Sequence, residues 1–175
     1  VDQCLSIGQE KVDSKENEII AIPRLLDSLE LHEGDVVTID AIGTQKDIVS
    51  KVIEKQANYL LEVKGNQPSL MESIQDAMEA VRRFRECEYV KEFTERDESH
   101  GLIVNRTCRT CSDLYFLGRI FKEWEGIKTF GYIDNWRINK ASGEDVTERH
   151  YFITSLENDP KEYSSLRGNI GGLRM

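Results

Sequence analysis

Apolar and polar positions alternate with two different periods in the first 84 residues of the chain. A period of two, or a short β-branched run, predicts a strand, and apolar residues three and four positions apart predict an amphipathic helix. In chain order, the predicted elements are a strand over residues 4–12, a helix over 18–30, a strand over 36–40, a helix over 45–56, a strand over 59–63 and a helix over 68–84. The strand over 36–40, the helix over 45–56 and the strand over 59–63 form a βαβ unit. A right-handed crossover makes its two strands parallel and brings their carboxyl ends to one edge of the sheet.

The pattern changes after residue 84, where alternating runs come in pairs separated by short polar turns. Residues 90–96 and 102–108 flank one such turn, and residues 130–138 and 146–154 flank another. We expect two β-hairpins, with the apolar stretch 114–124 packed beneath them as a loop or short helix. The predicted fold class is α/β, or α+β overall, with a mixed sheet and helices followed by a β-rich antiparallel region.

The loops that follow the two parallel strands carry polar residues. Asp40 ends the first strand, and Lys64, Asn66 and Gln67 follow the second. A carboxylate in this place can bind Mg²⁺ as a hard oxygen ligand, and a lysine with two amides can contact a phosphodiester. The pattern predicts a metal-dependent phosphoryl-transfer site at the sheet edge. The alternative is structural: Asp40 caps the turn after its strand, and Gly65 and Asn66 only turn the chain.

Composition limits the classes of protein that this chain can represent. With 175 residues, 39% hydrophobic and 31% charged, it has enough apolar residues for one medium-sized domain or a core with an insertion. No apolar run approaches the roughly 18 residues that cross a bilayer, and the first residues do not resemble a secretory signal. The four cysteines are too few and too scattered for a disulfide framework. We therefore expect a cytoplasmic protein with reduced thiols and no membrane segment.

The net charge is acidic, at −9, with a sequence pI near 4.9. Such a surface repels phosphates, which argues against a stand-alone nucleic-acid-binding protein. It does not argue against a nuclease core, because clustered carboxylates hold cations there and DNA affinity can come from other parts of a larger protein.

Other residues give weaker patterns. Cys108 and Cys111 form a single CxxC motif inside a predicted strand, so we interpret them as ordinary strand cysteines. His100 and His150 show no metal-ligand spacing and are interpreted as ordinary surface or strand histidines.

Four segments carry a resemblance to a known family. They are IPRLLDSLEL, TIDAIGTQKDI, NYLLEVKGNQ and HYFITSL, in this order and at these spacings. Over residues 7–156 the chain resembles the H-repeat-associated (IS-As type) transposases of bacterial insertion sequences, which belong to the Asp-Asp-Glu superfamily. The resemblance implies a partial ribonuclease H-like core with a β-rich insertion, Mg²⁺ or Mn²⁺ as cofactor, and DNA at transposon ends as partner of the parent protein.

The resemblance places one of the three catalytic carboxylates in this sequence. Asp40 takes the place of the second aspartate. The first belongs to an Asp-Gly-Lys motif on a strand before the 4–12 segment, and no upstream residues remain to supply it. The glutamate belongs to a late helix whose beginning resembles residues 166–168, and Leu173 stands where the glutamate is expected. We therefore predict a transposase fragment that is inactive as this chain, with weak metal binding through Asp40.

The resemblance also suggests a division of the chain and an assembly. Residues 1–67 would form the partial catalytic core, residues 68–156 a helix plus the β-rich insertion, and residues 157–175 a C-terminal tail that starts a truncated or diverged catalytic helix. A missing strand would leave a sheet edge uncovered, which a homodimer would cover.

The competing hypothesis comes from another class of protein. In it, the chain is a non-enzymatic, acidic α+β interaction module or a decayed scaffold, and Asp40 only caps a turn. Such a protein would show no dependence on divalent ions.

Overall fold

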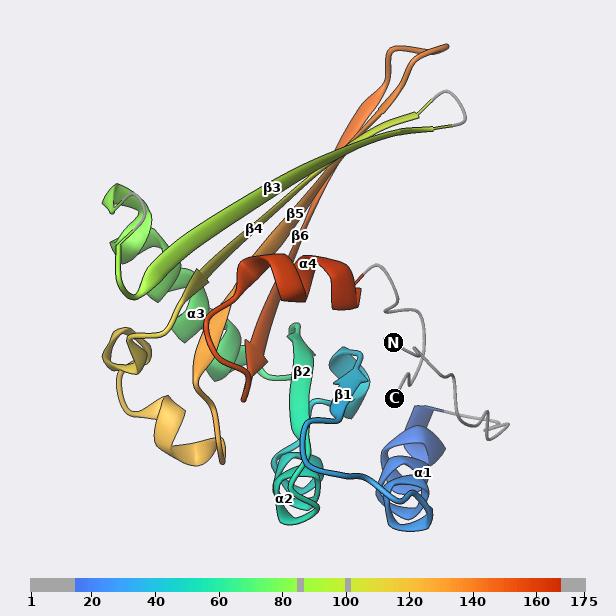
Figure 1. Ribbon diagram of the computed structural model, residues 1–175, viewed down its shortest axis with the longest axis vertical. Helices are drawn as coiled ribbons and strands as arrows, with labels where there is room; N and C mark the ends of the chain where they lie inside the picture. The colour runs from blue at the N-terminus through green and yellow to red at the C-terminus, as the bar shows by residue number, and fades with distance from the viewer. Residues whose placement is uncertain (1–14, 85–86, 100–101, 168–175) are drawn as a thin grey trace.

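A single mixed sheet organises the chain. The computed structural model describes residues 15–84, 87–99 and 102–167, and within them six strands pair in the order β1-β2-β6-β5-β4-β3 (Figure 1). The strands are β1 (Val36–Ile39), β2 (Asn58–Val63), β3 (Val90–Ser99), β4 (Leu102–Cys111), β5 (Thr129–Asn139) and β6 (Asp145–Thr154). The helices are α1 (Lys15–Ser28), α2 (Lys46–Glu54), α3 (Pro68–Ala80) and α4 (Pro160–Arg167). The fold is therefore α+β, as the sequence predicts.

The predicted βαβ unit is present. β1 and β2 are parallel, with Val36 opposite Asn58 and Ile39 opposite Leu61, and α2 forms the crossover between them. The apolar stripe of α2 is buried against the sheet, which accounts for its helical spacing in the sequence. The strand expected over residues 4–12 lies outside the described residues.

Both predicted hairpins are present, and they pair with each other. β3 is antiparallel to β4, β4 to β5 and β5 to β6. β6 is in turn antiparallel to β2, with Val63 opposite Tyr151, so the hairpins continue the sheet begun by the parallel pair. The stretch between the hairpins forms two short 3₁₀ helices, η3 (Leu114–Leu117) and η4 (Ile120–Glu123).

The two faces of the sheet bury separate apolar clusters. The larger cluster combines one face of the sheet with α1, α2, α3 and the 114–124 region. The smaller one surrounds Tyr163 of α4 with Leu60, Cys108, Ile133 and Phe152 on the opposite face. Figure 1 shows α3 and α4 on opposite sides of the sheet, with the far parts of β3–β6 extending past both helices as a twisted arm. Among the described residues, no helix is long and apolar enough to cross a membrane.

Candidate functional site at the carboxyl ends of β1 and β2

Asp40 follows directly after β1 and is exposed. Its backbone is still extended, and its Oδ1 atom accepts a hydrogen bond of 3.1 Å from the backbone N–H of Ile42. The carboxylate therefore caps the short 3₁₀ helix η1 (Ala41–Gly43). The structural role weighed for Asp40 is present, and the exposure of the residue leaves the carboxylate open to solvent.

The loop after Asp40 is tied to β2 by a buried hydroxyl. Thr44 is fully buried, and its Oγ1 donates a hydrogen bond of 2.6 Å to the carbonyl oxygen of Glu62. The same hydroxyl lies 3.3 Å from the carbonyl oxygen of Asp40. This threonine fixes the distance between the ends of the two strands.

Asn66 and Gln67 bind the two loops together. The side-chain amide of Asn66 donates to the carbonyl oxygen of Ala41 at 2.5 Å, and that of Gln67 donates to the carbonyl oxygen of Thr44 at 2.9 Å. The structure therefore brings the sequence-predicted residues to one edge, and it gives these two amide N–H groups a local structural role. Whether either side chain also contacts DNA stays a prediction.

Lys64 is the exposed cation of this edge. Its side chain is 58% exposed, and its Nζ atom lies 3.4 Å from Oε1 of Glu62. The ammonium group of Lys64 is therefore open to a ligand that arrives from solvent, while it also partly neutralises the buried carboxylate of Glu62.

Glu62 is a central residue of the edge that the sequence reasoning missed. Its side chain is only 6% exposed, and its Oε1 atom lies 2.5 Å from Nδ1 of His150 on β6. Nε2 of His150 lies 3.8 Å from a carboxylate oxygen of Glu148. A buried carboxylate needs compensation by hydrogen bonds or opposite charge, and His150 and Lys64 supply both. The available signal was one acidic residue inside the apolar run of residues 59–63.

The register of the strands places Glu62 beside Asp40. Ile39 is opposite Leu61, and one further step along both parallel strands sets Asp40 next to Glu62. Because side chains alternate between the faces of a sheet, both carboxylates belong to the face opposite the buried side chains of Ile39 and Leu61.

The described residues contain no group of three His, Cys, Asp or Glu side chains placed to hold a metal ion. Cys108 and Cys111 belong to the two different apolar clusters, so their side chains occupy opposite faces of β4, as expected for ordinary strand cysteines. His100 lies outside the described residues.

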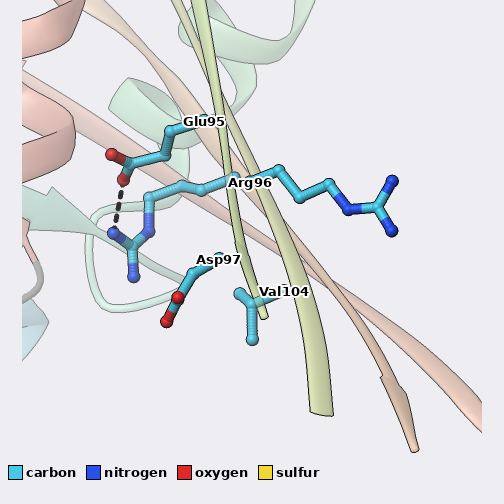
Figure 2. Close-up of a pocket in the computed structure, with 5 residues that line it drawn as sticks. Glu95, Arg96, Asp97 and Val104 are labelled. Carbon is cyan, nitrogen blue, oxygen red and sulfur yellow. Dashed lines mark hydrogen bonds and ion pairs between the residues drawn. The ribbon is translucent and has the colours of Figure 1, made fainter. Parts of the chain in front are cut away.

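A cavity of about 340 Å³ lies on the arm, away from β1 and β2, and is lined by Glu95, Arg96, Asp97, Val104 and Arg106 (Figure 2). The dashed contact in Figure 2 joins Glu95 to Arg106 at 2.6 Å. Glu95 also accepts a hydrogen bond of 2.7 Å from Ser164, and Nε of Arg106 donates to Asn135. These contacts fasten α4 to the arm, and we assign the cavity no ligand.

The fold and the edge define an α+β domain with polar loops at the carboxyl ends of a parallel strand pair, where ligands gather in open α/β sheets. No protein-family model matches the chain. Curated relatives do match. The chain is 38% identical over 167 residues to the putative transposase YncI of Escherichia coli O157:H7, a match that covers 90% of this chain and 40% of the relative.

Two further relatives come from Escherichia coli K12. The H repeat-associated putative transposase YhhI is 31% identical over 163 residues, which cover 92% of this chain and 42% of the relative. The H repeat-associated putative transposase YbfD is 46% identical over 72 residues, which cover 41% of this chain and 28% of the relative. The chain belongs to the family of the H repeat-associated putative transposases. Its match spans less than half the length of each of these three relatives.

Proposed function

We propose that this chain is part of a transposase of the Asp-Asp-Glu type, with a ribonuclease H-like core, that cleaves and transfers DNA at transposon ends. Family membership together with the place of Asp40 carries the proposal. Asp40 is an exposed carboxylate directly after a strand whose Val37 and Ile39 side chains are buried. By itself the chain is proposed to be inactive, because it supplies one of the three catalytic carboxylates.

The cofactor proposed for the parent protein is a pair of Mg²⁺ or Mn²⁺ ions. Such ions, when bound, activate the attacking hydroxyl and stabilise the leaving oxygen in phosphodiester transfer. Asp40 fits as one hard oxygen ligand, since one carboxylate oxygen can cap η1 while the other faces a ligand. The two further carboxylates would come from outside the described residues.

The polar residues around Asp40 suit a phosphodiester. Lys64 offers an exposed ammonium to a phosphate, and Asn66 and Gln67 hold the loops that set the place of Asp40. We propose Lys64, Asn66 and Gln67 as the DNA-contacting residues of the parent protein, with Lys64 providing the charge. We also propose a cytoplasmic location, where DNA is accessible and thiols stay reduced.

Calorimetric titration with Mn²⁺ tests the metal-binding part of this proposal. Asp40→Asn removes the charge but keeps an oxygen that can accept the Ile42 N–H, so the cap of η1 is retained. Asp47→Asn, at an exposed carboxylate in the first turn of α2, is the matched control. We expect saturable binding to the unmodified chain and to Asp47→Asn, and its loss in Asp40→Asn.

The opposite outcome favours the second candidate function. If neither the unmodified chain nor the control binds Mn²⁺, Asp40 acts as a cap alone. The chain is then better described as a non-enzymatic interaction module or scaffold, in which the hydrogen bond from Ile42 to Asp40 is the whole role of this carboxylate.

A further inference from the structure

The side chains of β6 reach the edge that carries Asp40. A continuous series of charged or titratable groups connects β6 to this edge. It runs from Glu148 to His150 on β6, then to Glu62 on β2, and ends at the exposed Lys64. Glu62 is at its centre, because His150 and Lys64 both contact its Oε1 atom, at 2.5 Å and 3.4 Å. The second hairpin is therefore directly connected to the carboxyl edge.

We propose that Glu62 and His150 are positioning residues that hold the Lys64 ammonium at the edge beside Asp40. The use of Lys64 toward DNA rests on the proposed function, whereas its placement by Glu62 follows from geometry and burial alone. His150 fixes this carboxylate, and the contact lies between two side chains that are only 20% and 6% exposed. The fixed carboxylate of Glu62 then attracts the ammonium group of Lys64, which lies on the solvent side of it.

Burial decides how strongly Glu62 acts. The carboxylate of Glu62 is 6% exposed, so water and salt screen its charge much less than they screen a surface carboxylate. Lys128 offers the contrast, because it pairs with Glu157 at the shorter distance of 2.6 Å, but Glu157 is 86% exposed. If distance alone set the strength of an ion pair, Lys128 would be held more firmly than Lys64. If burial of the carboxylate sets it, Lys64 is held more firmly.

The main chain of Glu62 adds a second link. Its carbonyl oxygen accepts the hydrogen bond from Thr44, in the loop that follows Asp40. Glu62 thus holds the loop after Asp40 through its backbone and Lys64 through its side chain. The position of the proposed phosphate contact, Lys64, is therefore fixed relative to the proposed metal ligand, Asp40.

Competitive amine labelling of the whole chain tests this placement. A short pulse of an N-hydroxysuccinimide ester, followed by peptide mass spectrometry, reports the reactivity of each lysine relative to the others. Glu62→Gln removes the buried charge, and Glu157→Gln is the matched control. We expect Lys64 to label about threefold faster in Glu62→Gln, the size of a lost ion pair worth somewhat under 1 kcal/mol, with Lys128 changing less in Glu157→Gln.

Two further variants separate positioning from a general effect on the fold. Glu62→Asp keeps the charge and should restore part of the protection of Lys64, whereas His150→Ala, which removes the imidazole that contacts the carboxylate, should weaken it. Hydrogen exchange of β2 and β6 checks that each variant is folded. Unchanged Lys64 labelling in folded Glu62→Gln would overturn the proposal. If Glu62→Gln unfolds, the His150→Ala variant carries the test, and unchanged Lys64 labelling in it would equally overturn the proposal. Because no metal or DNA is present, this result is independent of the Mn²⁺ titration.

Discussion

At the scale of single residues, the carboxyl edge was partly predictable from sequence. The crossover rule brings Asp40 and Lys64 to one edge, because both follow parallel strands of the same βαβ unit. The acceptors of the Asn66 and Gln67 amides were not predictable, since an amide can bind any nearby carbonyl. His150 was interpreted as an ordinary surface or strand histidine, and its contact with Glu62 was missed because it joins positions 88 residues apart.

Thr44 provides a residue-scale prediction about the stability of this edge. Thr44→Val keeps the shape of the side chain but leaves the Glu62 carbonyl without its buried donor. We expect a loss of about 1–3 kcal/mol in the free energy of unfolding, measured by urea denaturation. Thr147→Val, at an exposed position of β6, should change it by less than about 0.5 kcal/mol. Equal effects of the two substitutions would contradict the role given to the Thr44 hydroxyl.

At the scale of elements, local patterns predict the helices and hairpins, and long-range pairing decides the sheet. Alternation sets which face each residue of β5 and β6 occupies, and short polar turns set which strands are consecutive. Neither pattern indicates that β6 pairs with β2 or that β4 pairs with β5. α3 is also shorter than predicted, ending at Ala80 and continuing as the 3₁₀ helix η2 (Val81–Arg83).

The docking of α4 on β3 leads to a prediction that depends on pH. Ser164 is buried and donates to Glu95, and this hydrogen bond, together with that from Arg106, holds the pKa of Glu95 below its ordinary value of 4.5. A lowered pKa in the folded state means that ionised Glu95 stabilises the fold above pH 4.5 and loses this contribution as the pH falls through the lowered value. We expect Ser164→Ala to cost about 1 kcal/mol at pH 7.

Urea denaturation at several pH values measures this dependence. The difference between Ser164→Ala and the unmodified chain should shrink on acidification, because protonated Glu95 is a weaker acceptor. The exposed neighbour Ser165, whose hydroxyl donates to the Lys161 carbonyl within α4, is the control, and Ser165→Ala should be nearly neutral at every pH. A cost for Ser164→Ala that stays constant down to pH 3 would argue that the hydroxyl stabilises α4 by some other contact.

At the scale of the whole molecule, the two edges of the sheet differ in chemistry. Among the described residues, β1 and β3 are the outermost strands. β3 reads VKEFTERDES, and charged side chains on an edge strand discourage pairing with another chain. β1 reads VVTI and carries no charge. Of the two edges formed by the described residues, β1 is therefore the one expected to pair with another chain, and we predict that the homodimer suggested by the sequence uses it.

Light scattering after size-exclusion chromatography tests the homodimer over a range of concentrations. The mass of one chain is 20.1 kDa. We expect the weight-average mass to rise toward twice that value between micromolar and near-millimolar protein. Reversing charge on β3 with Lys91→Glu should leave this rise unchanged if β1 forms the contact, because Lys91 lies on the opposite edge strand. A mass of 20.1 kDa at every concentration would exclude the homodimer, and a rise abolished by Lys91→Glu would place the contact on β3.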